Sequence, residues 1–391
     1  MSHLEIFDQR MMRSLGTPLA HLVEGDGCRV RDADGTWYLD FLAGIAVNSL
    51  GHAHPVFVDA VSRQAATLAH VSNYFSTPAE LELADRLVRL AGAVESGRVW
   101  FGNSGAEAME AAFKLARLNH RQQGRTKILA LHDAFHGRTM GALALTGKPH
   151  MRAPFEPMPG GVEHIDTTIA ALEASIDETV AALFVEPIKG EAGVLPLPDG
   201  FLAAARELTA RHGALLVVDE IQTGAARTGE WFGYQHDGVT PDAITVAKGI
   251  GGGFPIGALV TFGEASDLFT RGMHGSTFGG NPLATATANA VLGEIERADL
   301  VGNARVRGAQ LAERILAIGS PLVTEVRGRG LLLGIGLAEP HAGALATAAM
   351  REGLIINAAN DSSIRLAPPL IIGDAEIDEF IDRFSRALAA L

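Results

Sequence analysis

Two short apolar runs near the middle of the chain each end in a polar functional group. Residues 214–218 (ALLVV) precede Asp219, and residues 243–247 (AITVA) precede Lys248. Their length and β-branched content are typical of buried strands in a helix-covered sheet. Ligands bind at the carboxyl ends of strands in open α/β sheets, so we expect the carboxylate and the amine to face one ligand. A glycine-rich loop follows Lys248 and indicates a close approach of the backbone.

The apolar pattern alternates between strand and helix from about residue 97. Strands are predicted at 98–101, 127–131 and 182–185, with a helix at 105–118 after the first of them and another at about 200–212 after the last. Repeated strand–helix units predict an α/β fold with a mostly parallel sheet and right-handed crossovers.

The two ends of the chain differ from this pattern. Near the N-terminus we predict a hairpin around residues 32–35 and helices that begin at Pro55 and Pro78. The C-terminal part predicts a smaller α+β lobe, with helices and strands at 282–298, 303–318, 321–327, 331–335 and 375–391.

The segment after the strand at 98–101 carries a helix-start signal. Ser104 and Glu107 match a capping box, which places the start of the helix here. A helix N-terminus at the carboxyl end of a strand offers free amides and a positive dipole to a phosphate. A capped helix without a ligand is the alternative. No Walker lysine or Gly-x-Gly-x-x-Gly follows, so a nucleotide is the weaker choice.

Composition narrows the class of protein. The chain has 391 residues with a net charge of −13, which argues against a nucleic-acid partner. The single cysteine excludes an intrachain disulfide, and His52 and His54 have no Cys or Glu at metal-ligand spacing. No leader or membrane-spanning run is apparent, so we expect a cytoplasmic protein.

A buried lysine paired with a carboxylate favours Schiff-base chemistry. Burial lowers the pKa of a lysine and makes it a nucleophile. Pyridoxal phosphate is the cofactor that needs both groups, because a carboxylate keeps its pyridine nitrogen protonated. The alternative is that Asp219 caps a loop and Lys248 lies on the surface. Phe135 and Arg138, after the strand at 127–131, could stack on a planar ring and bind a carboxylate.

Taken together, these segments resemble the class III aminotransferases, which belong to the fold-type I pyridoxal-phosphate enzymes. The resemblance covers nearly the whole chain and rests on the following motifs: 43–48 (AGIAVN), 51–55 (GHAHP), 103–108 (NSGAEA), 135–139 (FHGRT), 219–224 (DEIQTG), 248–249 (KG) and 274–282 (HGSTFGGNP). It implies a seven-stranded sheet in a large domain at residues 52–275. Residues 1–51 and 276–391 would form the second, smaller domain.

The resemblance also implies roles around the cofactor. Lys248 would attach pyridoxal phosphate covalently and move the proton, and Asp219 would pair with the pyridinium nitrogen. Gln222 would bind the phenolic oxygen. Phe135 and Ile221 would pack on opposite faces of the ring.

The phosphate contacts follow from the same resemblance. Gly105 and Ala106 would donate amides, and Ser104 would add its hydroxyl. Thr277 resembles a threonine that reaches the phosphate of the neighbouring subunit. A homodimer with shared active sites is therefore expected.

The substrate contacts are implied in the same way. Arg138 resembles the arginine that holds the α-carboxylate of the amine donor, and Ser276 a further substrate contact. Arg365 resembles the arginine that binds the α-carboxylate of glutamate. Glu191 would pair with Arg365 in the other half-reaction and swing away when glutamate arrives. A structural ion pair is the alternative for these last two residues.

The expected reaction is transfer of the δ-amino group of N2-acetylornithine to 2-oxoglutarate. Ornithine, succinylornithine, 4-aminobutyrate and succinyldiaminopimelate remain rival donors, because one acyl group is a modest pocket difference. An aminomutase, a racemase or a non-enzymatic regulatory module also remains open. Two positions depart from the family pattern: Met109 replaces a usual Asn, and Ala226 replaces a common glycine.

Overall fold

The larger lobe is built on the predicted α/β sheet. The structure is a computed structural model that describes residues 3–391; Met1 and Ser2, part of the predicted N-terminal segment, lie outside the described residues. β12 runs in the opposite direction to the other six strands of the sheet. The strand order is β4 (Arg98–Gly102), β12 (Gly257–Thr261), β11 (Ala243–Val246), β10 (Leu215–Asp219), β7 (Val180–Val185), β5 (Lys127–Leu131) and β6 (Val162–Ile165). The mostly parallel, seven-stranded sheet is confirmed.

Alternating side chains of the sheet pack into two separate cores. On one face Ala182 and Val217 join the buried side of α5 (Gly105–Leu118). On the other face Leu183 and Val218 join α4 (Pro78–Ala91) and α9 (Phe201–His212). Both faces are covered, which explains why these strands read as continuous apolar runs instead of alternating ones.

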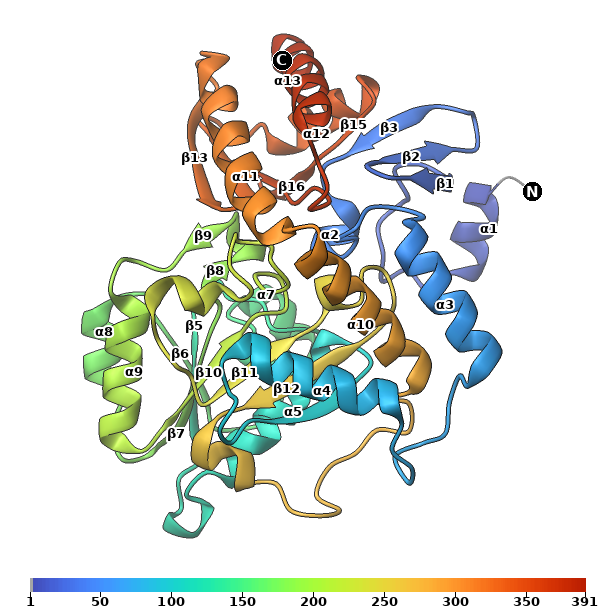
Figure 1. Cartoon of the computed structure of the whole chain (residues 1–391). Coiled ribbons are helices and arrows are strands. Elements are labelled where there is room, and N and C mark those ends of the chain that lie inside the picture. Colours follow the sequence, from blue (N-terminus) through green and yellow to red (C-terminus); the bar gives the residue numbers. More distant parts are fainter. Residues whose placement is uncertain (1–2) are drawn as a thin grey trace.

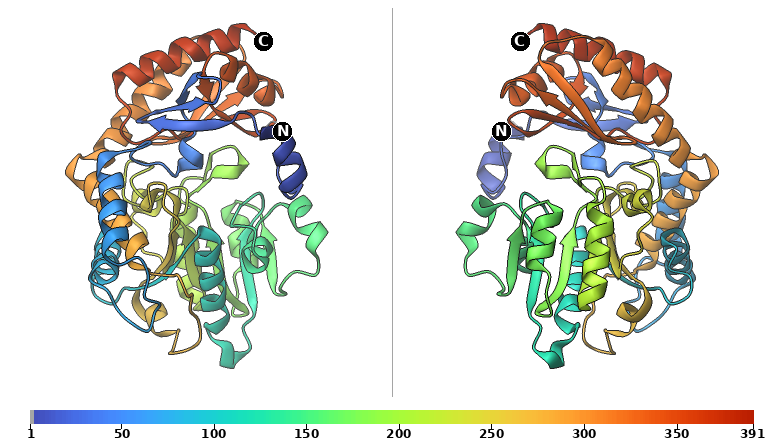
Figure 2. Two further views of the ribbon diagram at one scale, coloured as in Figure 1. Left: turned by 90° about the vertical axis from the view of Figure 1, so that its right-hand side faces the viewer. Right: turned by 90° about the vertical axis from the view of Figure 1, so that its left-hand side faces the viewer.

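The smaller lobe lies above the sheet in both side views (Figure 2). Its N-terminal strands share a sheet with β15 from the far end of the chain, and its second sheet has the order β13-β14-β17-β16. The strands of the lobe are β1 (Leu22–Asp26), β2 (Arg29–Asp32), β3 (Trp37–Asp40), β13 (Val323–Arg329), β14 (Leu332–Leu337), β15 (Leu354–Ile355), β16 (Asn357–Asn360) and β17 (Ser363–Leu366). The predicted boundaries at 51/52 and 275/276 stay a prediction.

Helices connect and cover the two lobes (Figure 1). The longest, α11, starts at Leu300 rather than near 303, because the Asp299 carboxylate accepts the Gly302 amide at 3.1 Å and caps it. The remaining helices and short strands are α1 (His3–Arg10), α2 (Ala43–Ala46), α3 (Pro55–Thr67), α6 (Met140–Leu145), α7 (Pro149–Arg152), α8 (Ile169–Ser175), β8 (Ile188–Lys189), β9 (Leu195–Pro196), α10 (Pro282–Arg297), α11 (Leu300–Ala317), α12 (Ala342–Arg351) and α13 (Asp374–Ala389).

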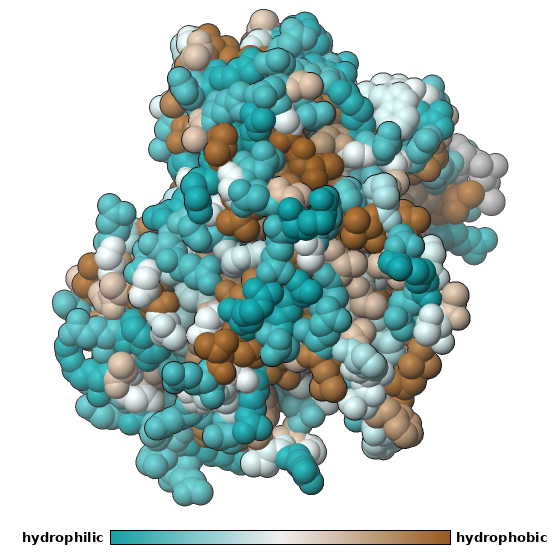
Figure 3. Space-filling view, in the orientation of Figure 1, coloured by the Kyte–Doolittle hydropathy of each residue, from teal (hydrophilic) through white to brown (hydrophobic). Residues whose placement is uncertain are grey.

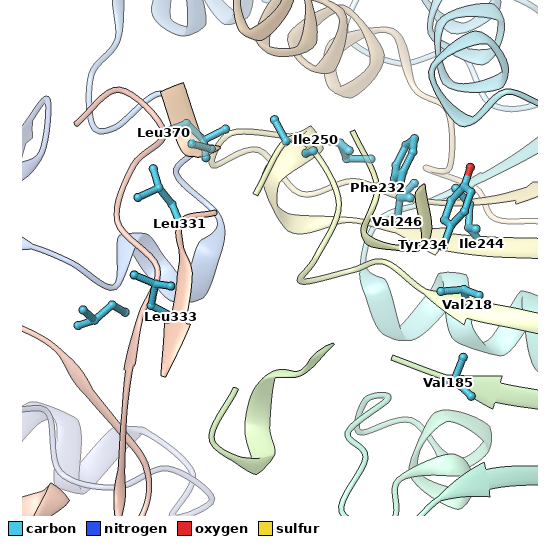
Figure 4. Close-up of a cluster of buried hydrophobic side chains, with 14 of the residues drawn as sticks. Val185, Val218, Phe232, Tyr234, Ile244, Val246, Ile250, Leu331, Leu333 and Leu370 are labelled. Atoms are coloured by element: carbon cyan, nitrogen blue, oxygen red, sulfur yellow. The ribbon is translucent and has the colours of Figure 1, made fainter. Parts of the chain in front are cut away.

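Buried apolar side chains continue from the sheet into the smaller lobe. Val218, Ile244 and Val246 lie in strands of the sheet, while Leu331 and Leu333 lie on the other side of the same cluster (Figure 4). The lobes therefore share one core at their junction, which holds the ends of β10 and β11 close to the second lobe.

The surface is mixed in character. Hydrophilic side chains dominate the face in Figure 3, with separate hydrophobic patches between them. Within residues 3–391, none of the helices combines the length and low charge needed to cross a bilayer.

Candidate active site

Asp219 is the last residue of β10 and is 4% exposed. One carboxylate oxygen lies 2.8 Å from Nδ1 of His136; the other accepts hydrogen bonds from the Ile221 amide at 3.0 Å and from the Thr245 hydroxyl at 3.2 Å. Burial of His136 opposes its protonation, but the hydrogen bond to Asp219 and the charges of Asp219 and Glu186 together outweigh this effect and raise the histidine pKa. The carboxylate is held in one orientation.

Lys248 lies beside Asp219 because β10 and β11 pair in parallel, with Asp219 opposite Thr245. β11 ends at Val246, and Lys248, three residues after Thr245, adopts a left-handed φ of 45°. Burial and the nearby Arg365 guanidinium both lower its pKa. A lysine held in this way has a larger neutral, nucleophilic fraction than a surface lysine.

The two strand ends open into a cavity of about 450 Å³. Its walls come from the strand ends, the N-terminus of α5 and the loop after Lys248. The predicted site residues that line it are Ser104, Gly105, Ala106, Phe135, Arg138, Asp219, Ile221, Gln222 and Lys248. Residues from sequence positions more than one hundred apart are therefore brought together as predicted, although their individual roles stay predictions.

The N-terminus of α5 faces this cavity. The Ser104 hydroxyl accepts the Glu107 amide at 3.2 Å, as the capping box predicts. The returning half of the box differs from the prediction, because the Glu107 carboxylate accepts hydrogen bonds from Asn103 instead of the Ser104 amide. Any side chain at Gly105 would meet Ile221, since a Cβ there would lie 2.8 Å from Ile221 Cδ1. Glycine therefore lets Ile221 pack tightly beside the free amides of the first helical turn.

Phe135 and Arg138 lie on the loop after β5. The Arg138 guanidinium lies 5.6 Å from the centre of the Phe135 ring. The Phe135 amide donates to the buried Glu186 carboxylate at 3.1 Å, and burial raises the pKa of Glu186 to about 7. The loop is fixed at Phe135, while Arg138 remains exposed at the mouth of the cavity.

Arg365 reaches the same region from β17 of the smaller lobe and is 2% exposed. It forms an ion pair with Glu191, and it also donates to Gln222 Oε1 at 3.2 Å and Asn357 Oδ1 at 2.8 Å. Burial would raise the pKa of Glu191, but the charge and hydrogen bond of Arg365, with the charges of Lys248 and Lys148, together outweigh it and lower that pKa. Glu191 and Arg365 thus lie next to the cavity, linked to it through Gln222.

Ser276 and Thr277 lie apart from the other predicted residues. The Ser276 hydroxyl accepts a hydrogen bond at 3.1 Å from Asn103, which lines the cavity. Thr277 is exposed and does not line this chain's cavity. Its predicted contact with a neighbouring subunit stays a prediction.

Three polar residues were missed by sequence reasoning. His136 binds Asp219, Glu186 holds the Phe135 amide, and Asn357 binds Arg365. His136 follows Phe135 directly, and Glu186 follows an apolar strand, so their positions at strand ends were available signals. Asn357 had no such signal, because its register against Arg365 depends on the pairing of β16 and β17.

Comparison with known proteins agrees with a transaminase site. The sequence matches the class-III aminotransferase family over residues 11–388, and the chain belongs to that family. It is 55% identical over 372 residues to the acetylornithine aminotransferase of Mycobacterium tuberculosis strain H37Rv, covering 95% of this chain and 92% of that protein.

Solved structures agree with this assignment. The chain superposes on N-acetylornithine aminotransferase from Stenotrophomonas maltophilia with a TM-score of 0.85, at 36% identity and over 99% and 98% of the two chains. An ornithine aminotransferase from Toxoplasma gondii, with partial occupancy of PLP at its active site, gives a TM-score of 0.92 at 33% identity over 99% and 93% of the chains.

Proposed function

We propose that this aminotransferase transfers the δ-amino group of N2-acetyl-L-ornithine to 2-oxoglutarate, giving N-acetylglutamate 5-semialdehyde and L-glutamate, as a step of arginine biosynthesis. The observation that carries the proposal is the convergence of Lys248, Asp219 and Arg138 on one cavity, with Arg365 beside it and hydrogen-bonded to the lining residue Gln222. The 55% identity to an acetylornithine aminotransferase supports the choice of amine donor.

The residues present fit pyridoxal 5'-phosphate, on which class-III aminotransferases depend. Helix amides at Gly105 and Ala106 suit its phosphate, and Asp219 suits the ring nitrogen. Phe135 and Ile221 supply two apolar walls for a flat ring. Bound pyridoxal phosphate supplies an aldehyde for condensation with amines and a ring that takes up the electron pair released at the substrate carbon.

The chain's own residues would transfer protons and keep the cofactor-binding side chains in position. Lys248 would hold the cofactor through its side-chain amine and, when that amine is free, would carry a proton to and from the substrate carbon. Asp219 keeps its position through His136, whose ring is fully buried against it. Gln222 shares its side-chain oxygen with Arg365, so it lies between the cofactor end of the cavity and the carboxylate anchor.

Each of the two arginines binds the α-carboxylate of a different substrate. Arg138 holds the α-carboxylate of N2-acetylornithine, which leaves the δ-amine over Lys248. Arg365 holds the α-carboxylate of glutamate after Glu191 releases it. Ser276 adds a further contact, through Asn103 or directly.

We further propose a cytoplasmic homodimer in which Thr277 completes the neighbouring subunit's phosphate site. The exposure of Thr277 on this chain is compatible with that role. No nucleic-acid or membrane partner is proposed.

A single half-reaction tests the proposal. The cofactor-loaded protein is mixed, without keto acid, with N2-acetylornithine, ornithine, succinylornithine, 4-aminobutyrate or succinyldiaminopimelate, and the cofactor absorbance is followed. We expect N2-acetylornithine to convert the cofactor fastest and 2-oxoglutarate to restore it. Faster conversion by another amine would overturn the substrate assignment. Turnover without 2-oxoglutarate would favour an aminomutase or racemase.

A further inference from the structure

Arg227 is an interior arginine that the proposed mechanism does not use. It is 2% exposed, and among residues 3–391 no carboxylate forms an ion pair with it. Its Nη1 donates to the carbonyl oxygens of Leu331, at 3.1 Å, and Pro368. Its Nη2 has no partner within the described chain. Burial of a cation without a counter-ion costs free energy of folding. The position of Arg227 between these two carbonyls therefore needs an explanation.

The two carbonyls flank β14 and β17, a pair of strands of which β17 carries Arg365. Leu331 comes immediately before β14, and Pro368 lies two residues beyond β17. In the antiparallel β14–β17 pair Gly334 lies opposite Arg365. Arg227 therefore holds both strands at the same end, three residues from Arg365 along one of them.

The turn before β14 also docks directly on the Arg227 backbone. The Leu331 amide donates to the Arg227 carbonyl at 2.9 Å. Gly330 has a φ of 54°, and a Cβ there would lie 2.5 Å from the carbonyl carbon of Thr228 and 2.7 Å from the Arg227 carbonyl oxygen. Only glycine permits this approach without a shift of the turn.

On its other side Arg227 is tied to the cofactor end of the site. It follows Gln222 by five residues, and the Glu220 carbonyl accepts the Gly224 amide at 2.9 Å. The buried Glu220 carboxylate accepts the amides of Gly233 and Tyr234 at 2.7 and 2.8 Å. The segment that carries Arg227 is thus fixed to the sheet lobe.

We propose that Arg227 is a positioning residue that sets where Arg365 stands relative to Gln222 and Lys248, and so tunes affinity for the dicarboxylate substrate. The inference rests on the proposed function. Arg138 is carried by the sheet lobe alone and does not depend on Arg227. Loss of Arg227 therefore affects the glutamate side of the reaction selectively, whereas a purely structural role would affect both sides equally.

The test compares Arg227→Met and Gly330→Ala with a matched control, Arg125→Met. Arg125 also donates to backbone carbonyls, of Val180 and His212, but inside the sheet lobe. Binding of glutarate, an unreactive dicarboxylate, is measured by calorimetry on the cofactor-loaded proteins, with KM values for both substrates and a thermal melt.

We expect both test variants to bind glutarate roughly tenfold more weakly, with an unchanged KM for N2-acetylornithine and no change in the control. Unchanged glutarate affinity in both variants, even with a lower melting temperature, would overturn the inference, as would equal losses for the two substrates. Wild-type protein that binds glutarate but does not turn over N2-acetylornithine would instead overturn the proposed substrate, and the glutarate comparison would still decide the role of Arg227.

Discussion

Arg138 and Arg365 each place a guanidinium group at or beside the cavity, but Arg138 is exposed and Arg365 is buried. Arg138 is exposed on the loop after β5, rests against the Phe135 ring and, among residues 3–391, has no carboxylate in an ion pair. Arg365 is buried on β17 and already binds Glu191, Gln222 and Asn357. One arginine is free to receive a carboxylate, and the other must first give up a partner.

This difference explains how one site can accept two substrates in turn. A carboxylate reaches Arg138 without breaking a protein contact. A carboxylate that reaches Arg365 must displace Glu191, whose side chain is 27% exposed and can turn towards solvent. Glu191 thus penalises ligands on the Arg365 side unless they replace its charge, which is a form of specificity by competition.

Lys248→Ala removes the side-chain amine towards which both arginines orient their substrates. We expect both half-reactions to fall at least ~10³-fold, because proton transfer and covalent attachment are lost together. The absorbance of lysine-bound cofactor should disappear as well. Lys127→Ala, which removes an ion pair with Asp177 at the other end of β5, is the control. Retained activity in Lys248→Ala would refute the assignment.

Arg365→Met and Arg138→Met separate the two anchors. We expect Arg365→Met to slow the glutamate half-reaction by roughly 10²-fold and the N2-acetylornithine half-reaction much less, because a charged hydrogen-bonded anchor is lost for one substrate only. Arg138→Met should show the reverse order. Single-turnover absorbance measurements with each amine give the two rates, and equal losses in either variant would contradict the division between the arginines.

The sequence predicted the sheet edge around Asp219 and Lys248 better than the region around Arg365. Asp219, Phe135 and Lys248 lie at or just beyond strand ends, so an apolar run followed by a polar group was enough to place them at one edge of the sheet. The β12 strand was missed because residues 249–257 were interpreted as a glycine loop and the short apolar run at 258–262 (ALVTF) was not interpreted as a strand. Its antiparallel direction depends on its pairing with β11 and β4.

The Arg365 region could not be derived from periodicity. Its contacts depend on the β14–β17 register and on how the two lobes meet, and both are long-range properties. Only the resemblance to a family suggested Glu191 and Arg365 as a pair. Ala226, where glycine is common, adopts a left-handed φ of 69°, a strain that composition alone does not reveal.

Glu191→Gln tests the difference between the two arginines, because it leaves Arg365, like Arg138, without a carboxylate partner. The amide keeps a hydrogen bond to Arg365 but removes the competing charge. We expect glutarate to bind about 5–10-fold more tightly, since a neutral partner is displaced at lower cost than a charged one. Selectivity for N2-acetylornithine over ornithine should fall, because the free arginine can capture an α-carboxylate. Weaker glutarate binding in this variant would contradict the competition argument.

The smallest expected effect is a pH dependence of stability at the same pair. The folded-state pKa of Glu191 lies below the ordinary glutamate value of 4.5, so its ion pair contributes stability that is fully present above that value. The contribution is lost as the pH falls through the lower, folded-state pKa.

Urea unfolding of the wild type and Glu191→Gln at pH ~7 and pH ~4 should therefore show the stability advantage of the wild type shrinking at the lower pH. The exposed Glu264→Gln serves as the control. A difference between wild type and Glu191→Gln that is the same at both pH values would mean that Arg365 does not hold Glu191 as a charged partner, and the contrast between the two arginines would disappear.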